Sequence, residues 1–281
     1  MNNMIETVII EDNWDINVRS IEKIKALYSD IYVINEEYVL KITDINSGKK
    51  QKIINLCMSK AYEKKLPVPK IIRTKNGELL LAQNHRTYSV SSYLRGHPYD
   101  FKERSLTQAA QTLALFHLCF EKEIELEQQV RDICGSVYPY DLSGLKHHNE
   151  DVKFVIKLIE QSPELSIDLP RQIGHFDYTV GNLIFENNRM VGLIDFDIMR
   201  VSETARDVAI ALYRLTNSVA QQKVFLDSYN AVKQLSDIEI EAMHDLYVDE
   251  MKRKLIYTIR RYEISSKPFD VLFDRVKKMG L

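Results

Sequence analysis

The sequence predicts an α+β fold in two lobes, a small antiparallel sheet with a helix first and a mostly helical lobe after it. Short apolar runs separated by turn residues recur in residues 31–42 and 70–94, on either side of one helix, as expected for paired strands. From residue 100 on, apolar residues recur about every three or four positions, as on helices that bury one face. We therefore expect an N-lobe over residues 1–94 and a C-lobe over residues 95–281.

The composition is that of a globular protein. The 281 residues are 45% hydrophobic, enough for two lobes with real cores. No apolar run approaches the roughly 18–20 residues that a membrane span needs, and the net charge of −2 gives no pull toward nucleic acid or anionic membrane. Three scattered cysteines, Cys57, Cys119 and Cys134, suggest free thiols. We expect a cytoplasmic monomer or homodimer that binds neither nucleic acid nor membrane.

Alternation and turn residues predict the elements of the N-lobe. Pro67 ends a helix, because proline disfavours the helical conformation of the residue before it. The expected elements are a strand over Ile5–Ile10, an amphipathic helix over Asn17–Leu27, a hairpin of Ile31–Ile34 with Tyr38–Ile42, a helix over about Gly48–Lys65, and strands at Lys70–Arg73, Leu79–Ala82 and Tyr88–Leu94.

Helical periodicity dominates the C-lobe outside one stretch. The apolar positions of its first helix predict burial, and His117 on that helix is expected to be a satisfied core residue instead of a ligand. The expected helices are Ser105–Phe120, one within Glu121–Asp151, then Val152–Gln161, Glu203–Asn217, Ala220–Gln234, Asp237–Ser265 and Phe269–Lys278.

The exceptional stretch is Ile173–Arg200, where polar residues gather between short apolar runs. Leu183–Phe185 and Met190–Ile194 predict two strands of a hairpin, joined by a turn over residues 186–189. Asn182 then stands just before the first strand, and Asp195 stands at the end of the second. Loops held by such a scaffold are where catalytic groups are commonly found.

These positions predict a magnesium and phosphate site. A hard divalent cation prefers oxygen ligands, one or two from the protein and the rest from phosphates and water, and Asn182 and Asp195 supply two such oxygens. Asp177 lies five residues before Asn182, placed to face a substrate hydroxyl while staying off the metal. Its expected role is to accept or orient the proton of that hydroxyl as the phosphoryl group is transferred.

Rival interpretations of the stretch have less support. Turn chemistry alone would account for an Asp- and Asn-rich loop, but not for the histidine, the paired acids and the apolar flanks together. An Asp-x-Asp phosphatase would need a parallel sheet, and the residues after Asp197 show no alternation of strands and helices. A dinuclear metal hydrolase would need several histidines, and the stretch contains only His175.

The motif order carries a family resemblance. His-x-Asp-x-x-x-x-Asn over residues 175–182, Ile-Asp-Phe-Asp over 194–197 and Arg-Asp-Val-Ala over 206–209 resemble the aminoglycoside phosphotransferase and choline kinase-like branch of the protein-kinase fold. Phe176 stands where that family usually has glycine. The resemblance implies that Asp177 is the catalytic aspartate, that Asn182 and Asp195 hold magnesium, and that Asp207 braces the catalytic loop.

The resemblance also implies a nucleotide site. A lone lysine in a strand usually faces solvent, but Val39-Leu40-Lys41 resembles the strand whose lysine binds the phosphates of ATP. By the same resemblance, Ser92, Tyr93 and Leu94 form the hinge whose backbone groups would hold the base of ATP or GTP.

Two departures from the family pattern stand in the N-lobe. The first glycine of the chain is Gly48, so the loop that covers the phosphates is expected to lack glycine and to span about Tyr28–Tyr32. The helix after Lys41 lacks the glutamate that usually pairs with this lysine, and Gln51 or Asn55 is the expected substitute.

The expected function is a magnesium-dependent kinase that phosphorylates a hydroxyl group of a small molecule with ATP or GTP. Aminoglycoside-like, choline-like and homoserine-like acceptors all stay open, because the acidic residues of the last helices are interspersed with basic ones. The alternative is a non-catalytic or weakly active nucleotide-binding regulatory protein of the same fold, which the two departures would also suit.

Overall fold

The protein is seen in a computed structural model that describes residues 2–24, 29–135 and 168–261, together with residues 153, 154, 156, 157 and 160, which are helical. Its first part is a six-stranded antiparallel sheet in the order β1-β2-β3-β6-β4, with β5 also paired to β6. The elements of this part are α1 (Asn2–Asn13), β1 (Ile21–Ile24), β2 (Asp30–Ile34), β3 (Tyr38–Asp44), η1 (Ile45–Ser47), α2 (Gly48–Glu63), β4 (Ile71–Ile72), β5 (Leu81–Gln83) and β6 (Arg86–Ser92).

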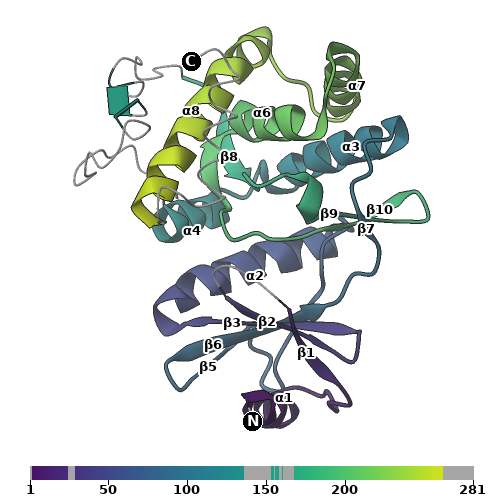
Figure 1. The fold of residues 1–281 in the computed structure, drawn as a ribbon, viewed down its shortest axis with the longest axis vertical. Coiled ribbons are helices and arrows are strands. Elements are labelled where there is room, and N and C mark those ends of the chain that lie inside the picture. The colour runs from purple at the N-terminus through teal and green to yellow at the C-terminus, as the bar shows by residue number, and fades with distance from the viewer. Residues whose placement is uncertain are drawn as a thin grey trace.

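The two faces of this sheet serve different purposes. Leu40 and Val90 point to one face, where they pack with Ile10 of α1 and with Trp14, which follows this helix, in a separate core. Because side chains alternate along a strand, Lys41 points to the opposite face, and α2 lies on that side, between the sheet and the helical part (Figure 1). The pleat of β3 therefore aims Lys41 toward the interior of the molecule.

The N-terminal segment differs from its expectation. Ile5–Ile10 belongs to helix α1 and not to a strand, and this helix buries Ile9 and Ile10 against the sheet, with Trp14 just after its end. The residues expected as a helix over Asn17–Leu27 include strand β1, which pairs with β2 from Ile21 opposite Ile34. Packing against the sheet outweighs local propensity in both places.

The second part is mostly helical, as expected. Its elements are β7 (His97–Pro98), α3 (Glu103–Phe120), α4 (Ile124–Cys134), β8 (Arg171–Gly174), η2 (Val180–Asn182), β9 (Leu183–Glu186), β10 (Arg189–Leu193), β11 (Arg200–Glu203), α6 (Thr204–Leu215), α7 (Val219–Asn230) and α8 (Asp237–Arg261). This part also contains two small sheets, β10-β9-β7 and β11-β8, and the β9–β10 hairpin projects at one side of the molecule (Figure 1). The helix expected over residues 269–278 lies outside the described residues.

The larger core crosses the expected lobe boundary. It joins Ile54 and Cys57 of α2 to Leu113 and Phe116 of α3 and continues through α6 and α8. The division at residue 94 stays a prediction. In the described part of the chain, no helix is long and apolar enough to cross a membrane.

Buried ion pairs attach α8 to β11 and α6. Arg206 bonds Glu203 at 2.8 Å and Asp249 at 2.6 Å, and Arg200 bonds Glu250 at 2.7 Å. Burial alone would raise the pKa of Glu203, but the charge of Arg206 and a hydrogen bond from Ser202 lower it to about 2. The ionised form of Glu203 is therefore the one that the fold stabilises.

We expect Glu203→Gln to destabilise the protein at neutral pH but not in strong acid. A pKa lowered from 4.5 to about 2 corresponds to about 3 kcal/mol of folding free energy. Because the pKa is lowered, this contribution is complete above pH 4.5 and is lost as the pH falls toward 2. Urea unfolding of both proteins across this range measures it, and an equal difference at every pH would contradict the assignment.

Candidate active site

Hydrogen bonds to its backbone amides hold the loop His175–Asp177 in place. Strand β8 pairs with β11 up to Gly174 opposite Arg200, and the loop begins at the next residue. The buried carboxylate of Asp207 accepts hydrogen bonds from the backbone amides of His175 and Phe176, both at 2.7 Å. This confirms that Asp207 braces the loop.

Asp207 is itself held in the core. His117 Nε2 lies 3.1 Å from its carboxylate, and His117 Nδ1 lies 2.7 Å from the hydroxyl of Tyr229. Burial would raise the pKa of Asp207, but the hydrogen bond with His117 and the charges around it hold the pKa below its usual range. His117 is fully buried, so the expectation of a satisfied core histidine is confirmed.

Phe176 has a backbone conformation that glycine adopts more easily than any other residue. Its φ is 58°, in the left-handed region, where a non-glycine residue costs about 1–3 kcal/mol. Its ring is fully buried. The guanidinium of Arg200 stacks on this ring, with Cζ 3.9 Å from the ring centre. Burying such a ring contributes about 1.5–3 kcal/mol, so the packing offsets the strain.

His175 orients the acid that follows it. Its Nδ1 accepts a hydrogen bond from the amide of Asp177 at 3.2 Å, so the proton of the neutral ring lies on Nε2, which donates to the carbonyl of Ile194 at 3.0 Å. The ring thereby ties the Asp177 loop to the end of β10.

Asp177, Asn182 and Asp195 meet at one end of the β9–β10 hairpin. Asn182 Nδ2 donates to both the carboxylate and the carbonyl of Asp177, each at 2.9 Å. The amide of Ile194 donates to the carbonyl of Asn182 at 3.0 Å, which brings Asp195 beside it. The hairpin is confirmed, with its turn at Asn187 and Asn188, both at positive φ.

Asp195 adopts an unusual backbone conformation with a φ of 63°. Its side chain is open to solvent, but the protein atoms packed behind it and the charge of Asp197 raise its pKa, while Lys41 acts in the opposite direction. A site that raises the pKa of an acid in this way would gain from a bound cation.

Lys41 is paired with Asp197, a residue to which the sequence had assigned no role. Its ammonium bonds the Asp197 carboxylate, and its side chain is only 19% exposed. Gln51 and Asn55, the residues that could have bonded this ammonium instead, are not its partners: the oxygen of Asn55 accepts from Gln51, and Asn55 donates to Ser89 and to the carbonyl of Leu79. The acid comes from the loop after β10 and not from α2.

The loop expected to cover the phosphates is also different. Of Tyr28–Tyr32, the residues Asp30–Tyr32 are part of strand β2, paired with Ile42, Lys41 and Leu40. Tyr28 lies outside the described residues.

The segment predicted as the hinge, Ser92–Leu94, begins at the last residue of strand β6. The amide of Ser92 donates to the carbonyl of Lys70 at 2.8 Å, and that of Tyr93 donates to Glu37 at 2.7 Å. A nucleotide base would therefore bond other backbone groups of this segment. Leu94 packs so closely on Gly192 of β10 that a Cβ there would lie 2.6 Å from it.

One further charged residue reaches the site from α8. Lys254 Nζ lies 4.0 Å from Asp177 and 4.0 Å from Glu250, and its side chain is 9% exposed. Burial lowers its pKa, which Glu250 and Asp177 partly restore. Sequence reasoning missed Lys254, because it stands among other basic residues of a long helix.

Comparison with known sequences connects the chain to kinases. The model of the phosphotransferase enzyme family matches residues 20–242. The homoserine kinase of Allorhizobium ampelinum is 26% identical over 189 residues, which cover 63% of this chain and 58% of that protein. The homoserine kinase of Gluconobacter oxydans is 29% identical over 150 residues, covering 51% and 46%. The chain thus spans about half the length of these relatives.

Comparison with solved structures agrees on the fold. An amicoumacin kinase in complex with AMP-PNP and Ca²⁺ superimposes with a TM-score of 0.71 at 14% identity, covering 99% of this chain and 95% of that one. A spectinomycin phosphotransferase in complex with ADP and spectinomycin gives 0.69 at 14% identity, covering 98% and 93%. The protein-kinase-like two-lobed fold is confirmed, and with the matched family model it shows that this chain belongs to the phosphotransferase enzyme family.

Proposed function

We propose that this protein is a small-molecule kinase that transfers the γ-phosphoryl group of ATP or GTP to a hydroxyl group. The observation that carries the proposal is the pair of 2.9 Å hydrogen bonds that join Asn182 to Asp177 beside Asp195. They hold an acid suited to proton transfer next to two oxygen groups suited to a metal ion. The match to the phosphotransferase enzyme family supports the same reaction class.

Asn182 and Asp195 are the proposed magnesium ligands, and their chemistry fits that ion. Because Asn182 Nδ2 is used by Asp177, the side-chain oxygen of Asn182 is the atom left to coordinate a cation. When bound, magnesium would supply positive charge that neutralises the charge developing on the phosphate oxygens. Lys41 would contact the phosphates from the sheet, and the backbone of Ser92, Tyr93 and Leu94 would hold the base.

Asp177 is the proposed group that receives the acceptor. It would accept the hydroxyl proton or orient the hydroxyl oxygen toward the phosphorus, in the position that His175 and Asn182 fix. Asp207 holds the backbone of this loop, which would keep Asp177 in that position.

Lys254 favours an acceptor that carries an acidic group. The homoserine kinase relatives and the antibiotic kinases of the same fold suggest different acceptor classes. The carboxylate of a hydroxy amino acid would be attracted by Lys254, which lies 4.0 Å from Asp177, whereas choline and an aminoglycoside have no carboxylate to pair with it. We therefore propose a homoserine-like acceptor before an aminoglycoside or choline.

A panel of acceptors tests this proposal. The protein is incubated with magnesium and γ-labelled ATP or GTP, and with homoserine, 3-aminopropan-1-ol, choline or an aminoglycoside. We expect phosphorylated homoserine by mass spectrometry and much less product from 3-aminopropan-1-ol, which lacks only the carboxylate. Lys254→Met should remove that preference. Equal use of both alcohols would contradict the role of Lys254 while leaving the kinase proposal standing.

Two variants separate the metal site from the phosphate site. We expect Asp195→Ala to weaken ATP binding by at least about tenfold in magnesium and to leave it unchanged in EDTA, because only the metal contact is lost. Lys41→Met should weaken binding in both buffers, because it removes a direct phosphate contact. Titration calorimetry measures this, and a loss in EDTA for Asp195→Ala would contradict its assignment.

A nucleotide-binding regulatory protein is the second candidate, supported by the strand at Asp30–Tyr32 where a phosphate-covering loop was expected. It predicts binding of ATP without product from any acceptor. The pairing of Lys41 with Asp197 favours the kinase, since this lysine has a charged partner despite the missing helix glutamate.

A further inference from the structure

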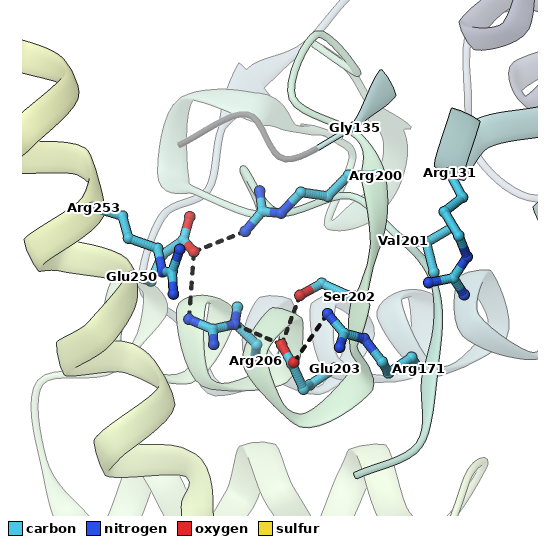
Figure 2. A pocket seen from close by; sticks show the side chains of 10 residues that line it. All are labelled: Arg131, Gly135, Arg171, Arg200, Val201, Ser202, Glu203, Arg206, Glu250 and Arg253. Carbon is cyan, nitrogen blue, oxygen red and sulfur yellow. Dashed lines mark hydrogen bonds and ion pairs between the residues drawn. The ribbon is translucent and has the colours of Figure 1, made fainter. Parts of the chain in front are cut away.

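A cavity of about 280 Å³ lies beside the catalytic loop, among α4, β8, β11 and α8 (Figure 2). Five arginines and only two acids line it, on separate elements that the fold brings together. None of the residues proposed for nucleotide, metal or acceptor lines this cavity. Its lining consists of Arg131, Gly135, Arg171, Arg200, Val201, Ser202, Glu203, Arg206, Glu250 and Arg253.

Arg206 lines this cavity, and its guanidinium is already paired with acids of the protein. It contacts Glu203 at 2.8 Å, Asp249 at 2.6 Å and Glu250 at 3.7 Å. Figure 2 shows its guanidinium between Glu203 and Glu250. Its charge is neutralised within the protein, so this arginine organises the cavity instead of offering a charge to a ligand.

Arg200 is the residue that points to a ligand. Its side chain is only 7% exposed, and Nη2 donates to Glu250 at 2.7 Å. Its other terminal nitrogen, Nη1, has no hydrogen-bond partner among the described residues. A buried charged donor without an acceptor is costly, so such a group marks the place of a missing partner.

Two more arginines stand at the mouth and can turn toward a ligand. Arg171 is 52% exposed and pairs with Glu203 at 3.2 Å, and Arg131 is 45% exposed and pairs with Glu127 at 2.7 Å. Exposed ion pairs of this kind are weak. An anion that accepts from several guanidinium groups at once would replace them at little cost, because arginine binds phosphate and carboxylate oxygens through paired donors.

We propose that this arginine cavity is a second anion site, which binds a small molecule through a phosphate group and is distinct from the nucleotide site at Lys41. A dianionic phosphate matches the excess of arginines better than a single carboxylate does, and Arg200, Arg171 and Arg131 are the lining residues that would donate to its oxygens. The volume exceeds that of inorganic phosphate alone and leaves room for a small organic group. Arg200 also rests on Phe176, the residue before Asp177, so the site adjoins the catalytic loop.

Calorimetry with the full chain at constant ionic strength tests the site. Inorganic phosphate and glycerol phosphate are the probes, without nucleotide. We expect at least one to bind, Arg171→Ala to weaken binding by at least about tenfold, and Arg19→Ala to leave it unchanged. Arg19 is the matched control, an exposed arginine paired with Glu37 at 3.0 Å on the other part of the molecule. Tighter binding of glycerol phosphate would identify a phosphorylated small molecule as the ligand, and equal binding would identify free phosphate.

A double variant separates a loss of anion binding from a loss of folding. Arg200→Met with Glu250→Met replaces a buried ion pair by apolar side chains, a change that is often tolerated. Glu250 also contacts Arg206 and Lys254, but Arg206 keeps Glu203 and Asp249, and Lys254 keeps Asp177. With an unchanged melting temperature, the double variant should abolish binding of both probes, while Lys41→Met should retain it. The proposal is overturned if neither probe binds, if binding survives both cavity variants, or if Lys41→Met removes it. None of these readouts requires kinase activity.

Discussion

Replacing Asp177 with asparagine should lower kcat for phosphoryl transfer by about 10²–10⁴-fold, with ATP affinity nearly unchanged. Asparagine keeps an oxygen that can accept the 2.9 Å hydrogen bond from Asn182, so the loop should keep its shape. It cannot take the proton of the acceptor hydroxyl. Steady-state kinetics with the acceptor found in the panel measures kcat, and calorimetry measures ATP binding.

Glu186→Gln is the matched control for this experiment, because it also exchanges an acid for its amide, at an exposed position at the end of β9. It should leave kcat unchanged. An Asp177→Asn protein that transfers phosphate as fast as the control would show that Asp177 does not act on the acceptor.

Replacing Asp207 with alanine should lower the free energy of unfolding by about 3–5 kcal/mol. The change leaves the buried amides of His175 and Phe176 and the ring of His117 without their acceptor. Asp207→Asn should have a smaller effect, because it retains one acceptor oxygen but loses the charge. Urea unfolding followed by circular dichroism measures both variants.

Asp227→Ala provides the comparison for this prediction. Asp227 also pairs with a basic residue, Lys223 at 2.8 Å, but its side chain is 64% exposed, so its removal should cost no more than about 1 kcal/mol. Similar losses for Asp207→Ala and Asp227→Ala would contradict the bracing role of Asp207.

The stretch proposed to be catalytic was predictable because its signals are local. Asp177 and Asn182 are five residues apart, and the turn between the next two strands contains two asparagines, which tolerate positive φ. Their hydrogen bond and the position of Asp195 follow from this short segment alone. The brace at Asp207 was expected from its motif, and the structure confirms its contacts with the loop.

The remaining features depend on contacts that no local pattern records. Lys41 and its partner Asp197 are 156 residues apart, and Arg200 and Glu250 are 50 residues apart. The apolar run Ile5–Ile10 satisfies a strand pattern, and only packing against the sheet makes it helical. Sequence reasoning also found no signal for the arginine cavity, since its lining residues are scattered over three helices, two strands and the residue after α4.

The most direct test of the kinase site is the mass of homoserine after incubation with ATP and the purified protein. We predict the gain of one phosphoryl group by the wild-type protein in magnesium, no gain in EDTA, and almost none with Asp177→Asn or Asp195→Ala. Product formed at the wild-type rate by either variant would contradict the site described here.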